Sequence, residues 1–387
     1  MRVAILQPHT TPCCGRDSLA MTEASGENNG LSTQPTAKEP SSSKHRKLPH
    51  NIKRVGGTLW FEETETFWTG QKFALALEEF ASSHSSNNNK NNNQTDTPGI
   101  LFHQHSGFQE ILVFSSAQYG TTLALDGVIQ LTERDEFSYH EMMTHMPLCS
   151  HQAPRRVLIV GGGDGGILRE VVKHDVVEEI IMVEIDPLVI QVCRKYFGDT
   201  TAVAFDDPRL RVVHADAATY LEQHAPDYFD VILGDTSDPV GPAATLFQPD
   251  FYESMYAALK QGGIICMQAE CFWIHLSLIS DMTACCADIF DTAEYTTTLV
   301  PTYPCGQIGF LLASKGTQRS TLRVPLRIPD FVDQLRWYSP AQHTAAFTLP
   351  PFVERELAQW QTTDAEDADN EDDYRCILEH LPSCALL

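Results

Sequence analysis

The sequence predicts an α/β protein in which a doubly wound sheet follows a small N-terminal antiparallel β-domain. Two observations predict this fold. Between residues 155 and 290, short apolar runs alternate with helical patterns, which is typical of parallel strands joined by crossover helices. Before residue 146, shorter alternating runs are separated by Tyr-Gly and Asp-Gly pairs, which indicate tight turns between antiparallel strands.

The 387 residues are expected to fall into four parts. Residues 1–50 are rich in Ser, Thr, Pro, Asn and Lys and lack Phe, Tyr and Trp, so they are predicted to be a disordered leader. Residues 51–145 form the β-domain, with a low-complexity, Asn-rich loop inserted at 82–97. Residues 146–360 form the Rossmann-like α/β domain, and residues 361–387 form an acidic C-terminal tail.

The β-domain begins with alternating residues from about residue 58, in LWFEETETFW and KFALALEEF. Short strands are then predicted at 108–114, 121–125 and 128–132. The turns between them contain Tyr119–Gly120 and Asp126–Gly127. We therefore expect one small antiparallel sheet, followed by a helix from residue 136 to residue 145.

The α/β domain begins with an apolar strand at 157–160, the turn GGGDGG at 161–166 and a helical pattern. A second strand, at 180–183, ends in Glu184. The remaining predicted elements are strands at 210–214, 227–233 and 263–268 and helices at 187–197, 250–260 and 275–290. In such a sheet, ligands bind across the carboxyl ends of the strands.

The glycine turn indicates the kind of ligand. Glu184 lies 18 residues after Gly166, close to the spacing of about 20 residues at which an acid binds ribose hydroxyls. Asp164 lies inside the turn, where the pyrophosphate of a dinucleotide would have to lie. A carboxylate there repels phosphate and attracts a cation. The crevice is therefore predicted to bind a nucleoside with a positively charged tail.

Four acids stand at the ends of successive predicted strands: Asp164, Glu184, Asp216 and Asp235. One such acid is ordinary, because it often caps the next helix, but four at one sheet edge converge on a site. Asp238 follows in the loop DTSDPVGPAATLF and either faces the same pocket or forms an Asx turn. No cluster with the spacing of metal ligands is present, so these acids suit the holding and deprotonation of a cation.

The composition excludes several classes of protein. A net charge of -24 argues against nucleic acid as a partner, although much of the excess lies in the C-terminal tail. Eleven cysteines without a CxxC pair indicate a reduced protein with no zinc site. Apolar runs are too short for a membrane span or a secretory signal, so a cytoplasmic location is expected.

Six segments together resemble the polyamine aminopropyltransferase family, which includes spermidine synthase: YGTTLALDGVIQLTERDEFSYHEMMTH, RRVLIVGGGDGGILREVVKH, VEIDP, GDTSDPVGPA, MQAECFW and VPTYPCGQIGF. The resemblance runs from about residue 60 to residue 357. It implies a methyltransferase-like domain behind a small β-domain, usually in a homodimer. It also implies transfer of an aminopropyl group from decarboxylated S-adenosylmethionine, a co-substrate rather than a cofactor, to putrescine. The products would be spermidine and methylthioadenosine.

The resemblance implies two sets of site residues. The donor set is Gln109, Gln130, His140, Asp164, Glu184, Asp216 and Ala217. The acceptor set is Tyr139, Asp235, Asp238, Gln268 and Tyr303. Asp164 would pair with the donor's ammonium tail, and Asp235 would be the catalytic acid residue. Because a protonated amine (pKa about 10.4) has no lone pair, a positioned carboxylate can activate it by accepting its proton. An aromatic face, of a Tyr or of Trp273, is expected near the acceptor's far ammonium.

Three alternatives depend on the same motifs. Relatives that methylate putrescine lose the acid of the glycine turn, whereas Asp164 is present here. Relatives that make thermospermine alter both the glycine turn and the DTSDP-like segment, and an inactive scaffold would lose Asp235 or Tyr139. Spermine synthesis from spermidine stays open, although the segment MQAE favours putrescine. His140 stands where some members carry Gln, and Thr236 where many carry Ser.

Overall fold

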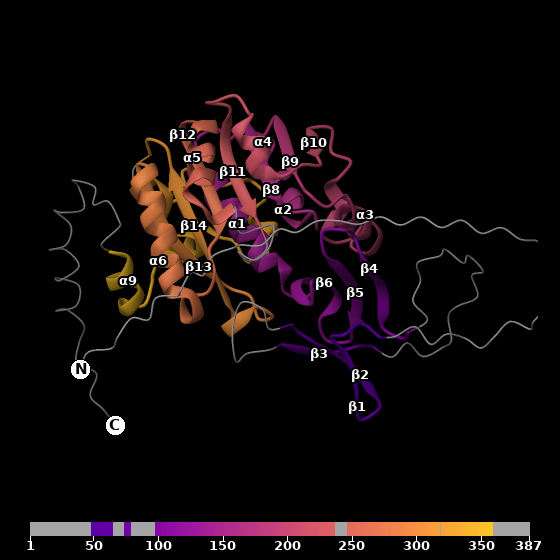
Figure 1. The fold of residues 1–387 in the computed structure, drawn as a ribbon. Coiled ribbons are helices and arrows are strands. Elements are labelled where there is room, and N and C mark those ends of the chain that lie inside the picture. The colour runs from indigo at the N-terminus through magenta and orange to yellow at the C-terminus, as the bar shows by residue number, and fades with distance from the viewer. Residues whose placement is uncertain (1–47, 65–72, 79–96, 237–245, 318, 359–387) are drawn as a thin grey trace, which may run out of the picture. The chain divides into compact units, whose positions relative to one another are not determined.

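The computed structural model of the chain describes residues 48–64, 73–78, 97–236, 246–317 and 319–358 (Figure 1). The predicted leader up to residue 47, residues 82–96 of the predicted Asn-rich loop and the acidic tail lie outside these ranges. Asp238, predicted to hold the acceptor, lies outside them as well.

The N-terminal strands form two antiparallel sheets, where the sequence predicted one. The first sheet contains β1 (Ile52–Val55), β2 (Thr58–Glu62) and β3 (Ala74–Ala76). The second contains β4 (Ile100–His105), β5 (Glu110–Ser116), β6 (Gly120–Leu125) and β7 (Val128–Thr132). The last three strands lie within two residues of their predicted positions.

Strand β5 explains why a second sheet is needed. Its side chains are apolar on both faces, so both faces must be covered. Leu112 and Phe114 face a small core shared with the first sheet, and the ring of Phe114 stacks on Phe61 at 4.9 Å between centroids. Ile111 and Val113 face the opposite way, into the core of the catalytic part of the chain. The two small sheets therefore cover each other, and one of them packs on the large sheet.

The large sheet has seven strands in the order β10-β9-β8-β11-β12-β14-β13. Their bounds are β8 Arg156–Gly161, β9 Glu179–Val183, β10 Leu210–Val213, β11 Phe229–Asp235, β12 Leu259–Gln268, β13 Thr292–Leu299 and β14 Gln307–Ser314. The first five strands are parallel, as the sequence predicted. The last two, which were not predicted, pair antiparallel as a hairpin on the edge of β12.

Helices cover both faces of this sheet (Figure 1). One face carries α1 (Glu136–Ser150), α2 (Gly166–Val171) and α3 (Pro187–Tyr196); the other carries α4 (Ala217–Glu222), α5 (Pro249–Ala258), α6 (Phe272–Ile289) and α9 (Pro351–Leu357). The alternation within β8 shows why, because Val157 and Ile159 face one layer while Leu158 and Val160 face the other.

Shorter elements complete the described chain: α7 (Arg319–Arg323), α8 (Pro340–Ala345) and 3₁₀ helices at Ala202–Ala204, Pro304–Gly306 and Val332–Gln334. Helix α5 ends two residues before its predicted end, because Leu259 and Lys260 already belong to β12. Among the helices that the structure describes, none combines the length and the apolar character of a membrane span.

Candidate active site

The glycine turn brings two strand ends into contact. Gly161, the last residue of β8, pairs with Asp235, the last residue of the neighbouring parallel strand β11. The φ angle of Gly161 is +75°, and a Cβ there would lie 2.2 Å from the carbonyl oxygen of Asp235. Only glycine permits this conformation and this approach. The turn thereby holds the residues after β8 beside the Asp235 carboxylate.

A pocket lies where the carboxyl ends of β8, β9, β11 and β12 meet the strands β6 and β7 of the N-terminal part. It is lined by every predicted site residue that the structure describes: Gln109, Gln130, Tyr139, His140, Asp164, Glu184, Asp216, Ala217, Asp235, Gln268 and Tyr303. The fold thus brings together residues from segments up to 194 positions apart (Gln109 to Tyr303), and the four strand-end acids Asp164, Glu184, Asp216 and Asp235 are among them.

Asp235 lines the pocket and accepts a hydrogen bond of 2.7 Å from the hydroxyl of Tyr139. The Tyr139 ring is buried and packs against Tyr303 and Phe310, with centroids 5.8 and 5.4 Å away. Burial, and next the negative charge of Asp164, raise the pKa of Asp235 to about 6. The charge of His140 and the hydrogen bond from Tyr139 act in the opposite direction.

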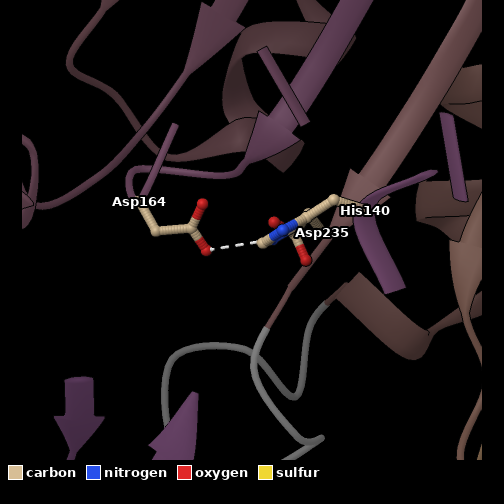
Figure 2. A group of neighbouring side chains, drawn as sticks. All are labelled: His140, Asp164 and Asp235. Atoms are coloured by element: carbon tan, nitrogen blue, oxygen red, sulfur yellow. Dashed lines mark ion pairs between the residues drawn. The ribbon is translucent and has the colours of Figure 1, made fainter. Parts of the chain in front are cut away.

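His140, Asp164 and Asp235 point toward one another (Figure 2), and one nitrogen and two carboxylate oxygens lie within 4.8 Å of one another. The Nε2 atom of His140 lies 3.6 Å from Asp164 Oδ2, and its Nδ1 atom hydrogen-bonds Glu136 Oε2 at 2.6 Å. His140 is buried, with 2% of the residue exposed. Two carboxylates at this distance form a site for a cation such as an ammonium group.

Glu184 lies on one side of this centre. Its Oε2 accepts a hydrogen bond of 3.2 Å from the Gly163 amide, and its Oε1 accepts one of 2.8 Å from the Asp186 amide. Burial raises its pKa to about 7, and the two amides act in the opposite direction. Nearby, the amide of Gln109 donates to Asp186 at 3.1 Å. Asp216 caps α4 by accepting from the Thr219 amide, so its carboxylate lines the pocket in a fixed orientation.

The pocket also contains two carboxylates that the sequence analysis did not assign to the site. Glu63 and Glu270 are buried and line the pocket. The amides of Phe73 and Ile129 donate to Glu63, while burial raises its pKa to about 7. Glu270 accepts a hydrogen bond of 3.3 Å from the Gln268 amide. Its place directly after β12 was a usable signal, since the other pocket acids also follow strands, whereas nothing in the sequence distinguishes Glu63.

Tyr303 and Gln130 line the pocket in contact with each other, because the Tyr303 hydroxyl donates to the carbonyl oxygen of Gln130 at 2.7 Å. Trp273 does not. It is 63% exposed, its ring packs against Phe272 and Phe352, and it is not among the described residues that line the pocket. The described pocket is lined instead by the aromatic side chains of Tyr139, Tyr303 and Phe108.

Family models match two segments of the chain: the spermine/spermidine synthase domain at residues 136–322 and the spermidine synthase tetramerisation domain at residues 94–133. A spermidine synthase of Dictyostelium discoideum is 42% identical over 300 residues, which cover 77% of this chain and 97% of that protein. The chain belongs to the spermidine synthase family.

Other members of the spermidine synthase family agree with this. A spermine synthase of Arabidopsis thaliana is 41% identical over 317 residues, covering 80% of this chain and 82% of that protein. A crystal structure of a spermidine synthase in complex with the transition state analogue AdoDATO superposes with a TM-score of 0.68 at 32% identity, over 81% of this chain and 99% of that chain. The resemblance inferred from the motifs is confirmed, as is the methyltransferase-like fold. The chain is an aminopropyltransferase of polyamine biosynthesis.

Proposed function

We propose that this aminopropyltransferase moves the aminopropyl group of decarboxylated S-adenosylmethionine to putrescine and releases spermidine and methylthioadenosine. The observation that carries the proposal is the position of Asp235 beside Asp164, with the hydroxyl of Tyr139 hydrogen-bonded to it. One carboxylate is then available to the ammonium tail of the donor and the other to the attacking amine of the acceptor.

On the donor side, Asp164 pairs with the ammonium tail and Glu184 holds the ribose hydroxyls. The other residues of the donor set line the same pocket: Gln109, Gln130, His140, Asp216 and Ala217. The donor's sulfonium already activates the carbon next to it, so the proposed reaction uses the donor as a co-substrate and needs neither cofactor nor metal.

The chemical step is a direct displacement. The acceptor nitrogen attacks the carbon attached to sulfur, the new carbon–nitrogen bond forms, and the carbon–sulfur bond breaks with its electrons on sulfur. Asp235 takes the proton that the nitrogen must lose, which is possible at neutral pH because its pKa of about 6 leaves it ionised. Tyr139 fixes the orientation of the carboxylate through its hydrogen bond.

On the acceptor side, the pocket matches a molecule with a cation at each end. Asp235 receives the reacting nitrogen, and Glu63 and Glu270 supply negative charge for the far one. Gln268 and Tyr303 line the space between, and Asp238 belongs to the acceptor set by the family pattern. Spermidine is the second candidate acceptor, because a plant spermine synthase is about as similar to this chain as the spermidine synthases are.

We further propose that the enzyme works as a cytoplasmic homodimer, without a membrane or nucleic acid as partner. The match to a tetramerisation-domain model supports an oligomer, and the net charge of -24 opposes binding to nucleic acid. Sedimentation at several protein concentrations distinguishes a dimer from a tetramer.

A product assay tests the proposed reaction. Purified protein is incubated with decarboxylated S-adenosylmethionine and either putrescine or spermidine, and the products are separated and identified by their mass. Spermidine and methylthioadenosine from putrescine are expected, and Asp235→Asn is the control that shows the product comes from this site. Product from spermidine alone would assign the enzyme to spermine synthesis instead, and product from neither acceptor would refute the proposed function.

A further inference from the structure

The imidazole of His140 lies between two carboxylates on opposite sides of the ring. Its Nδ1 atom is 2.6 Å from Oε2 of Glu136, one turn earlier on α1, and its Nε2 atom is 3.6 Å from Oδ2 of Asp164. The side chains of His140 and Glu136 are 3% and 4% exposed, so Glu136 does not reach solvent or substrate and acts only on its neighbours. Asp164, in contrast, lines the pocket (Figure 2).

Glu136 is itself held by Arg169 of α2. The two terminal nitrogens of the guanidinium donate to both carboxylate oxygens of Glu136, at 3.0 and 2.8 Å. Its Nε donates to Glu170 at 2.8 Å, which fixes the plane of the guanidinium. The imidazole also lies against the start of α2, where a Cβ on Gly166 would be 2.2 Å from a ring atom. Carboxylate and ring therefore have one orientation relative to the pocket.

The charged groups that face His140 come from each element around it: Glu136 on its own helix, Arg169 on α2 behind Glu136, Asp164 after β8 and Asp235 at the end of β11. Burial alone would lower the pKa of His140, but Asp164 and Glu136 outweigh it and raise the pKa to about 10. Burial would likewise raise the pKa of Glu136, but His140 and Arg169 lower it to about 2. Each ring nitrogen thus faces a carboxylate, and this arrangement favours the imidazolium in the enzyme without substrates, with one of its two N–H groups directed at Asp164.

The donor changes this balance, if its ammonium tail binds Asp164 as the proposed function requires. An imidazolium and an ammonium on one carboxylate repel each other in a buried site. A neutral imidazole that keeps its hydrogen on Nδ1, donated to Glu136, presents the lone pair of Nε2 toward Asp164. That lone pair can accept a hydrogen bond from the ammonium group.

We propose that the donor's ammonium group displaces the proton on Nε2 of His140, so that one proton leaves to solvent for each donor bound. Glu136 and Arg169 are the positioning residues for this exchange, because they keep the remaining hydrogen on Nδ1. This inference rests on the donor named in the proposed function. It gives His140 two roles: its imidazolium neutralises Asp164 before the donor binds, and its neutral imidazole accepts a hydrogen bond from the donor's ammonium group afterwards.

Calorimetry of donor binding counts this proton. Binding of decarboxylated S-adenosylmethionine is measured at about pH 8 in two buffers with different heats of ionisation, and the difference gives the protons released. We expect about one proton with the donor and close to none with methylthioadenosine, which has no ammonium tail. His140→Gln, which keeps a hydrogen-bonding side chain but cannot titrate, should bind the donor with close to no proton release.

A double-mutant cycle tests whether Glu136 acts through His140. Glu136→Gln should raise the KM for the donor about tenfold, while kcat changes by less than about threefold. In the His140→Gln background, the same change should add almost nothing. Glu294→Gln is the matched control, because Glu294 is equally buried against two arginines, Arg319 and Arg323, but does not line the pocket.

The outcomes separate this inference from the proposed function. Donor binding and turnover without proton release, or equal proton release by His140→Gln, would overturn the exchange at His140 and leave the proposed reaction intact. An equal effect of Glu136→Gln in both backgrounds would overturn the positioning role. Absence of any donor binding would overturn both the exchange and the proposed function.

Discussion

The hydroxyl of Tyr139 and the carboxylate of Asp235 are 96 positions apart in the sequence and 2.7 Å apart in the fold. Tyr139 comes from α1, which packs on one face of the large sheet, and Asp235 ends a central strand of that sheet. This hydrogen bond can form only when α1 and the end of β11 are correctly placed relative to each other. The hydrogen bond also lowers the pKa of Asp235, against burial and the charge of Asp164, which raise it.

The first prediction concerns the pH dependence of the unmodified enzyme. The pKa of Asp235 is raised to about 6, and only the ionised form can take a proton from the acceptor. Activity is therefore present above this pKa and is lost as the pH falls through it. We expect kcat/KM for the acceptor to fall about tenfold per pH unit below about pH 6, in initial-rate measurements from about pH 4.5 to 8. A flat profile across this range would contradict the role of Asp235 as base.

Tyr139→Phe should move that acidic limb. The hydrogen bond from Tyr139 lowers the pKa of Asp235, so its removal should raise this pKa and shift the limb to higher pH. We also expect kcat at the optimum to fall about tenfold, because the carboxylate loses its fixed orientation. Tyr196→Phe is a matched control, since that hydroxyl also makes a single hydrogen bond, to the Leu101 carbonyl oxygen, but does not line the pocket.

Asp235→Asn should separate binding from chemistry. An amide of the same shape cannot accept the proton, so kcat should fall about 10²–10⁴-fold. The dissociation constant of methylthioadenosine, measured by calorimetry, should change by less than about threefold, because the contacts proposed for the nucleoside are elsewhere. The exposed Asp206→Asn provides the control for the substitution itself. An unchanged rate in Asp235→Asn would exclude Asp235 from the chemistry.

Asp164→Asn should discriminate between two ligands that differ by a cationic tail. We expect the donor to bind about 10–100-fold more weakly, because a charge-assisted contact is lost. Methylthioadenosine should lose less than about threefold. Competition titrations with both ligands on one preparation provide the comparison, and equal losses for the two would show that Asp164 does not bind the tail.

Glu63→Gln should make the protein more stable and less active. The pKa of Glu63 is about 7 in the fold, above its value of 4.5 in the unfolded chain, so the folded state binds the proton more tightly. Ionisation of this carboxylate therefore lowers the free energy of unfolding. The loss grows as the pH rises from 4.5 to 7 and stays constant above that. Gln has no such cost, so at about pH 8 the variant should melt about 2–4 °C higher without substrates.

The activity of Glu63→Gln should fall, mainly through a higher KM for the acceptor, if Glu63 supplies charge for the far amine. Glu178→Gln, at a site where the side chain is 61% exposed, should change neither property. A variant that gains no stability at pH 8, or one that keeps the acceptor KM, would contradict the corresponding half of this prediction.

Much of the site could be predicted from the sequence because its acids follow consecutive parallel strands. The carboxyl ends of such strands share an edge, so Asp164, Glu184 and Asp235 had to converge once the alternation of strands and helices was recognised. The roles of Tyr139 and Tyr303 needed more, since an aromatic residue on a helix or in a loop is ordinary core. Only the resemblance to a family selected them in advance.

The remainder depends on contacts that no local pattern encodes. Glu63 follows β2, and the position of that small sheet at the pocket is set by tertiary packing. Arg169 contacts Glu136 only because α1 and α2 lie side by side. The β13–β14 hairpin was missed because its strands are mostly buried on both faces and show no alternation in burial. Trp273 belongs to the quoted segment MQAECFW, but its ring packs against Phe272 and Phe352, and membership of a motif does not show which way a side chain points.

Glu63 reaches the pocket from the segment after β2, and its carboxylate accepts hydrogen bonds from the backbone amides of Phe73 and Ile129. Asp235, in contrast, ends a central strand of the large sheet. In a chimeric protein that joins the N-terminal sheets of one relative to the large sheet of another, the pocket would therefore be lined by residues from both parent enzymes. Its choice of amine would follow neither parent unless both halves had been selected for the same substrate. If Glu63 binds the far amine as proposed, the N-terminal sheets contribute to the choice of acceptor, in addition to any part they have in assembly.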